Sequence, residues 1–186
     1  GQALSIERFD RLGGDQAVHI EDFAQIFGVY PEDKYKKASA VDIVKVLATE
    51  GDDDDVREFV RRLTFNTLIG NADMHLKNWS VYYPDRRTAR IAPAYDFVST
   101  IAYPELDDEG AALKFSRTKR FDAFGPDELA HLAGRAGLPV NMVIEAAKET
   151  AERFQDVWRT EHKNLPLHQN VIEAIERQLT RVPLTS

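Results

Sequence analysis

Residues 70–80 read GNADMHLKNWS, and residues 94–97 read AYDF. Asp73 is followed five positions later by Asn78, and a second aspartate, Asp96, comes downstream. In phosphoryl transfer, one carboxylate orients the attacking hydroxyl, while an asparagine and a second carboxylate hold magnesium on the phosphates. The order of these three side chains therefore predicts phosphoryl-transfer chemistry.

The segments on either side of this motif have the periodicity of regular elements. Upstream, apolar residues recur at helical spacing over 56–67 and predict a helix that runs into the motif. Downstream, residues 79–83 and 88–92 are typical of two strands of a hairpin. Pro93 ends the second strand, so we expect residues 94–96 on a loop, where catalytic groups are usually held.

The rest of the chain favours helices. Serine and aspartate at positions 39 and 42 are typical of a capping box that opens a helix to about residue 49. The other patterns predict a half-buried strand over 3–9, a helix over 20–27, a short strand over 112–116, and helices around 129–136, 140–158 and 172–182. The expected fold class is α+β, mostly α-helical, with residues 1–186 forming one domain.

Composition limits the classes of partner. The 186 residues are 43% hydrophobic, enough for a sizeable core in one domain. A net charge of −7 disfavours non-specific binding to nucleic acid or to anionic membranes. The chain has no cysteine, which excludes disulfides and thiolate metal sites. No apolar run approaches the roughly 18 residues of a membrane helix, so we expect no membrane partner.

An acidic run occupies residues 52–55. Four aspartates are compatible with a metal-binding cluster. The favoured interpretation is structural, because carboxylates at a helix start accept hydrogen bonds from free backbone amides and offset the helix dipole.

The side chains of the central motif suit distinct roles. Asp73 can accept a hydrogen bond from a substrate hydroxyl, and Lys77 can neutralise a phosphoryl group in transfer. Asn78 and Asp96 offer the oxygen ligands that magnesium prefers, alongside phosphate and water. Each residue alone is more often structural, and the ordered set carries the functional interpretation.

The motif also resembles known families. Residues 73–78 fit the D-x-H-x-x-N catalytic loop of phosphatidylinositol-kinase-like enzymes. Residues 68–80 together with 93–96 resemble the C-terminal domain of HipA-like serine/threonine kinases, the toxins of bacterial toxin–antitoxin modules. Further agreement comes from segments 6–11, similar to that family's hinge strand, 19–23, and the late segments 112–115 and 119–122.

The resemblance implies roles for individual residues around the phosphates. Asp73 resembles the catalytic aspartate, and His75 resembles a supporting loop residue. Asn78 and Asp96 resemble the Mg²⁺ ligands. The implied fold is a protein-kinase-like C-terminal lobe whose short β-hairpin carries the metal site.

A second set of roles concerns ATP. Glu7 and Phe9 match hinge positions whose backbone would meet adenine, and Asp10 matches a position near the ribose. Kinases also need a phosphate-covering loop and a lysine for the α- and β-phosphates. Nothing before Ala3 supplies them, so we expect that the N-terminal lobe is absent from this chain and that the chain alone is inactive.

The resemblance further implies cellular context. Family members phosphorylate protein hydroxyls of aminoacyl-tRNA synthetases, are held by a DNA-binding antitoxin protein, and are cytoplasmic. Two alternatives stay open: a non-catalytic interaction module, and a metal-dependent phosphohydrolase using Asp73, His75 and Asp96. The hydrolase is disfavoured because such enzymes usually need more histidine ligands.

Overall fold

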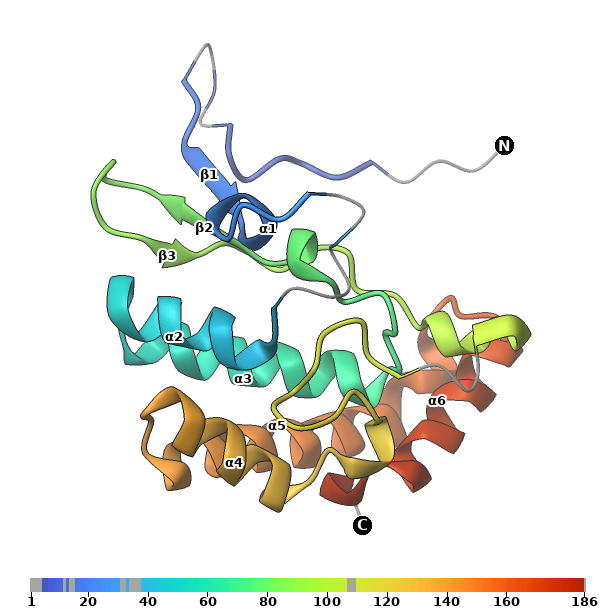
Figure 1. The fold of residues 1–186 in the computed structure, drawn as a ribbon. Coiled ribbons are helices and arrows are strands. Elements are labelled where there is room, and N and C mark those ends of the chain that lie inside the picture. The colour runs from blue at the N-terminus through green and yellow to red at the C-terminus, as the bar shows by residue number, and fades with distance from the viewer. Residues whose placement is uncertain are drawn as a thin grey trace.

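The computed structural model describes residues 5–11, 13, 16–30, 33, 38–106 and 110–185 (Figure 1). Three short antiparallel strands form one sheet, in the order β1-β2-β3. The strands are β1 (His19–Asp22), β2 (Ser80–Tyr83) and β3 (Arg90–Ile91). The α-helices are α1 (Phe23–Ile26), α2 (Ala40–Glu50), α3 (Asp53–Leu68), α4 (Pro126–Ala136), α5 (Val140–Glu161) and α6 (Gln169–Arg181). The expected α+β, mostly helical class is confirmed.

Short 3₁₀ turns complete the described elements. One of them, η2 (Leu76–Asn78), lies within the central motif, and η3 (Thr100–Ala102) follows residues 94–97. The others are η4 (Pro104–Leu106), η5 (Phe121–Ala123), η6 (His162–Asn164) and η7 (Pro183–Thr185).

The elements are stacked in layers. In Figure 1 the sheet lies above α2 and α3, which in turn lie above α4 and α5. Phe59, Leu63 and Val60 of α3 are fully buried, so α3 carries the centre of the core. The long α3 ends where the central motif begins, which places that motif between the helical layers and the sheet.

Several predicted elements are confirmed. The 39–42 capping box is present, with the Asp42 carboxylate accepting from the Ser39 amide at 2.9 Å. The hairpin forms with trimmed strands, pairing Val81 with Ile91. The late helices become α4, α5 and α6.

Three local predictions are wrong. Residues 5–8 of the expected 3–9 strand lie in no strand, because no neighbouring strand pairs with them, while residues 3 and 4 lie outside the described residues. Within the expected 20–27 helix, residues 20–22 belong to β1, since pairing with β2 outweighs local propensity, while residues 23–26 form α1. Residues 112–116 contribute only one isolated parallel bridge, Ser39 to Lys114.

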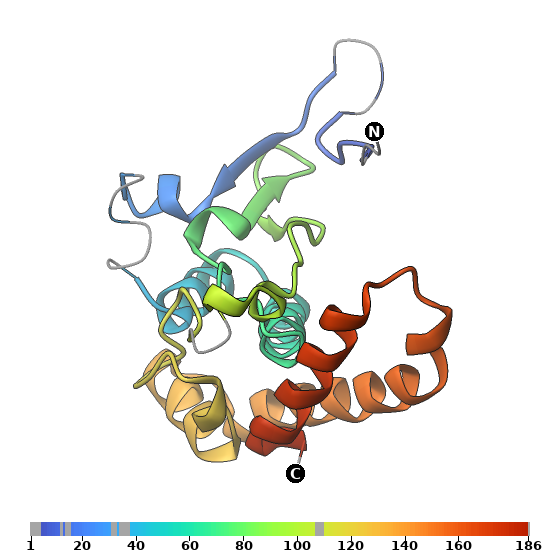
Figure 2. The same ribbon diagram turned by 90° about the vertical axis from the view of Figure 1, so that its right-hand side faces the viewer.

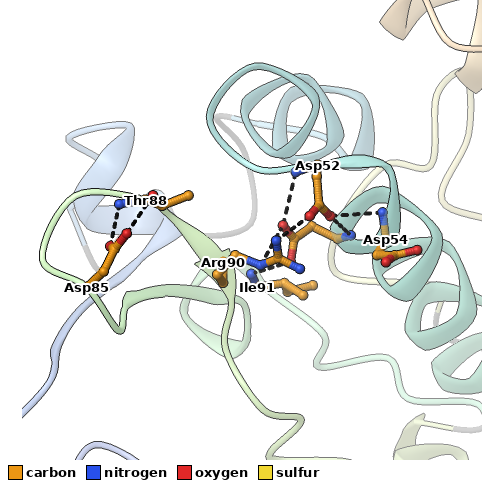
Figure 3. A network of polar contacts seen from close by, with 7 residues as sticks. Asp52, Asp54, Asp85, Thr88, Arg90 and Ile91 are labelled. Atoms are coloured by element: carbon orange, nitrogen blue, oxygen red, sulfur yellow. Dashed lines mark hydrogen bonds and ion pairs between the residues drawn. The ribbon is translucent and has the colours of Figure 1, made fainter.

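The acidic run of residues 52–55 connects the hairpin to α3 through hydrogen bonds and ion pairs (Figure 3). Asp52 caps α3, accepting from the amides of Asp54 and Asp55 at 2.9 and 3.1 Å. The buried Asp55 carboxylate accepts from the Ile91 amide at 2.9 Å and lies 3.3 Å from the Arg90 guanidinium, which also contacts Asp52. The Asp55 amide and the Arg90 guanidinium lower the pKa of Asp52. The structural interpretation of this run is therefore supported.

None of the helices in the described part of the chain is both long enough and apolar enough to cross a lipid bilayer.

Candidate catalytic site

The chain leaves α3 through a turn that only glycine fits well. Gly70 has a φ of +67°, and a Cβ there would lie 2.2 Å from Cδ1 of Ile101. The next residue, Asn71, is buried and donates to the Asn66 side chain at 2.7 Å. Its own oxygen accepts from the Asp73 amide at 3.1 Å. This turn therefore fixes where Asp73 emerges from the core.

Asp73 and His75 lie at the start of the loop. The Asp73 side chain is 47% exposed, and Nε2 of the buried His75 lies 3.9 Å from its Oδ1. The His75 amide donates to the Asp73 carbonyl at 2.7 Å, and the Asn78 amide donates to the His75 carbonyl at 2.9 Å. The loop thus holds Asp73 toward solvent with His75 supporting it from the protein side.

The structure brings Asn78 and Asp96 together. Nδ2 of Asn78 donates to Oδ2 of Asp96 at 2.9 Å and to the Asp73 carbonyl at 3.2 Å. Asn78 and Asp96, which flank the hairpin in the sequence, are therefore in contact, and Asp73 joins them through its backbone carbonyl. Two oxygen-bearing side chains at an accessible surface fit magnesium, which is usually held by one or two protein ligands plus phosphates and water.

The described residues contain no group of three or more histidine, cysteine, aspartate or glutamate side chains placed to hold a metal ion.

Asp96 has an unusual backbone. Its φ of +59° lies in the left-handed region, which costs energy for a residue with a Cβ. The Asn71 side chain donates to the Asp96 carbonyl at 3.3 Å and helps to hold this conformation. Backbone strain of this kind is commonly found at functional sites.

The loop of residues 92–99, named the metal loop after the proposed ligand Asp96, is anchored from both sides. The Tyr95 hydroxyl donates to the Lys77 carbonyl at 2.9 Å and makes a short contact with the Ser80 hydroxyl. Burial raises the pKa of Tyr95. The Arg62 guanidinium of α3 donates to the Ala92 carbonyl where β3 ends. The Lys77 side chain itself is exposed, beside the loop that its carbonyl anchors.

A hollow of about 540 Å³ opens beside Asp73. Thr100 and Lys119 line it together with small apolar residues. Burial lowers the pKa of Lys119. The hollow gives Asp73 an accessible side on which an acceptor group can lie.

The expected ATP-hinge residues have different surroundings. Phe9 stacks on Tyr95 with ring centroids 6.3 Å apart, so the N-terminal segment lies against the metal loop. Asp10 is buried and accepts from the Arg8 guanidinium at 2.7 and 2.8 Å, and this contact lowers its pKa. Glu7 is exposed. An Asp10 contact with ribose, as the resemblance implies, would compete with Arg8.

Two residues that hold the loops of the site in place were not predicted from the sequence. Thr100 accepts from the Ala72 amide at 2.7 Å and donates to the Gly70 carbonyl at 3.1 Å. Asn71 links three segments of the site, as described above. Neither residue belongs to a periodic pattern, and the only available signal was the position of Asn71 directly after the turn glycine.

Comparison with known proteins identifies the family of this arrangement. The family model of the HipA-like C-terminal domain matches residues 1–158 of this chain. A Sinorhizobium fredii protein named "Putative kinase Y4dM" is 56% identical over 184 residues, covering 99% of this chain and 44% of that protein. The serine/threonine-protein kinase toxin HipA of Shewanella oneidensis is 30% identical, covering 82% of this chain and 40% of the toxin. The chain spans less than half the length of these relatives.

A solved structure shows the same fold. The Shewanella oneidensis complex of HipA, HipB and operator DNA contains a chain that matches with a TM-score of 0.75 at 24% identity. The match covers 96% of this chain and 46% of that chain. The predicted kinase-like architecture is thereby confirmed at the level of fold.

Proposed function

This chain belongs to the family of HipA-like C-terminal domains, and we propose that it is the catalytic-loop lobe of an ATP- and Mg²⁺-dependent protein serine/threonine kinase. In this proposal residues 1–186 act as one domain. The observation that carries it is the 2.9 Å contact between Asn78 and Asp96, which brings the two proposed Mg²⁺ ligands together beside Asp73.

The roles of the side chains follow from their positions. The acceptor hydroxyl lies in the hollow beside Asp73, whose carboxylate orients it. Its oxygen bonds to the γ-phosphorus as the bond to the ADP oxygen breaks, and its proton passes toward Asp73. Asn78 and Asp96 hold magnesium, which when bound neutralises charge on the phosphates. Lys77, on the exposed side of the loop, adds positive charge near the group in transfer.

We place adenine at the N-terminal segment. The stacking of Phe9 on Tyr95 supports this placement, because it joins that segment to the loop that carries Asp96. Glu7 and Phe9 offer backbone groups to the base, and Asp10 turns from Arg8 to the ribose when the nucleotide binds.

Partners are assigned by the same family argument. The HipA of the neighbouring structure is bound to HipB and operator DNA, which supports a DNA-binding antitoxin as a partner here. The proposed substrate is a protein hydroxyl, of an aminoacyl-tRNA synthetase in the family's manner, and the proposed location is the cytoplasm. We propose no direct contact of this acidic chain with nucleic acid.

The test uses the protein that carries this chain, with variants Asp73→Asn and Asp96→Asn. Asp73→Asn should abolish labelled-phosphate transfer to a protein acceptor and leave nucleotide binding within about twofold, since its effect falls on turnover. Asp96→Asn should also weaken Mg²⁺-dependent nucleotide binding. Asp85→Asn, in the exposed hairpin turn, is the matched control and should keep full transfer. Undiminished transfer by Asp73→Asn would contradict the proposal.

The same assay separates the alternatives. Residues 1–186 expressed alone should show little transfer, because they contain no glycine-rich loop to cover the phosphates. An interaction module would bind nucleotide no better with magnesium than without it. A phosphohydrolase would release phosphate from a monoester in the presence of manganese, and Asp73→Asn would lower that rate.

A further inference from the structure

An apolar groove lies outside the proposed catalytic site. It has a volume of about 720 Å³ and runs between α3, α5, α6 and the segment that follows Asp96. Figure 2 shows α3 nearly end-on, with α5 and α6 beside it. Four of the exposed large hydrophobic side chains line this groove: Phe97, Val157, Leu165 and Leu167. Contiguous exposed apolar surface of this kind usually marks a binding site.

The wall of the groove is a connected series of aromatic rings. Phe97 stacks on Phe65 at 5.3 Å, Phe65 meets Phe154 edge-on at 5.5 Å, and Phe154 stacks on Trp158 at 5.8 Å. These contacts join α3, α5 and the metal loop into one continuous wall. Its volume falls within the 300–1,000 Å³ of small-molecule sites, which are also largely apolar.

Two buried polar atoms in this wall lack partners. Nε1 of Trp158 and Oγ of Ser99 are covered by neighbouring atoms and make no hydrogen bond within the described chain. An unsatisfied buried donor costs about 1–3 kcal/mol, so such groups are rare without a reason. Because both atoms are covered, a ligand in the groove contacts the side chains around them and not the donors themselves.

The ends of the groove differ in charge. Arg153 lines both this groove and the adjoining hollow that contains Glu58, Arg61, Arg62 and Glu149. It has no hydrogen bond or ion pair in the described residues, whereas Glu161 lies eight residues further along α5. That spacing is about 12 Å along a helix. An anionic head group is therefore favoured at Arg153 and disfavoured at Glu161, with the apolar body of the ligand lying between them.

We propose that this groove is a binding site for an apolar carboxylate, such as a medium-chain fatty acid. The carboxylate pairs with Arg153, and the chain lies against the aromatic wall. This site is separate from the proposed kinase function, and its test needs no nucleotide.

The experiment titrates the protein that carries this chain with decanoate, followed by calorimetry and by Trp158 fluorescence. We expect saturable one-to-one binding. Val157→Glu, which places a charge in the groove, should weaken binding at least tenfold. Val140→Glu changes an exposed valine on the same helix but outside the groove, and should leave binding within twofold.

Decanol and Arg153→Gln test the head group. Decanol should bind at least fivefold more weakly than decanoate, and Arg153→Gln should remove that difference. Absence of saturable decanoate binding, or equal weakening by Val140→Glu and Val157→Glu, would overturn the proposal. Equal binding of decanol and decanoate would overturn the assignment of Arg153. Circular dichroism of each variant checks that the fold is retained.

Discussion

Two groups of aspartates in this molecule differ in almost every physical respect. Asp55, at the start of α3, is 3% exposed, and its carboxylate accepts two backbone amides and lies beside Arg90. Asp73 is 47% exposed, and Asp96 is exposed on a left-handed backbone with the neutral Asn78 as its partner. The first group has its hydrogen-bonding capacity filled by the fold, while the second keeps oxygens accessible.

This difference separates structural carboxylates from candidate catalytic ones. A carboxylate that joins the hairpin to a helix must be neutralised within the fold, because an unpaired buried charge is costly. A carboxylate that binds a cation or a substrate must leave part of its coordination open. The run of four aspartates is the more conspicuous in the sequence, yet the separated pair has the properties of a site.

The largest expected effect comes from removing the structural carboxylate. Asp55→Ala should lower the free energy of unfolding by about 3 kcal/mol, because the Ile91 amide and the Arg90 guanidinium lose a buried partner. Asp54→Ala, an exposed neighbour in the same helix turn, is the control and should stay within about 0.5 kcal/mol. Urea melts measure both. A loss below about 1 kcal/mol for Asp55→Ala would remove the distinction between the two groups.

A smaller effect is expected at Asp96, where the backbone rather than the side chain carries the cost. Asp96→Gly should be more stable than Asp96→Ala by about 1 kcal/mol, because glycine adopts a φ of +59° without a Cβ penalty. Both variants lose the carboxylate, so their difference in thermal or urea melts isolates the backbone. Equal stability of the two variants would show that the left-handed conformation at this position carries no strain.

Removal of the Asp73 carboxylate should change stability least. Asp73→Ala should leave the free energy of unfolding within about 0.5 kcal/mol of the parent, since the side chain is about half exposed. Phosphoryl transfer by the whole protein should be lost in the same variant. A cooperative loss of several kcal/mol in urea would place Asp73 with the structural aspartates instead.

Helices with a strong apolar periodicity, and the spacing of the catalytic motif, could be predicted from the sequence alone. α3 and α5 have long amphipathic stripes, and their existence was predicted correctly. The association of Asn78 with Asp96 was predicted from a fixed order of residues around a hairpin. Strand β1 was missed because its edge of the sheet is only half buried and its pairing with β2 spans about sixty residues. Long-range pairing leaves no local signal.

The supporting residues of the site were not predictable in the same way. Asn71 and Thr100 act through single hydrogen bonds to backbone groups, and one polar residue in a loop is compatible with many structures. The strained conformation of Asp96 depends on contacts from Asn71 and the hairpin, so it follows from the assembled fold. The chemistry could thus be inferred from residue order, whereas the positions of its side chains depend on the assembled fold.

The last prediction concerns how the stability contributed by a structural carboxylate depends on pH. In the hairpin turn the amides of Thr88 and Arg87 and the Thr88 hydroxyl lower the pKa of Asp85 to about 2, from an ordinary 3.8 (Figure 3). A carboxylate with a lowered folded-state pKa adds stability that is fully present above its unfolded pKa and is lost as pH falls through the folded value. The contribution of Asp85 should therefore decline between about pH 4 and pH 2.

Asp85→Asn removes that titration but keeps an oxygen that accepts from the same two amides. Its stability should fall little at pH 7, and its decline between about pH 4 and pH 2 should be shallower than that of the parent. Glu145→Gln, an exposed change on α5, is the control and should follow the parent curve. Urea midpoints at half-unit pH steps measure the slopes. Parallel curves for Asp85→Asn and the parent would mean that the turn does not favour the ionised carboxylate, and that acid sensitivity arises elsewhere in the fold.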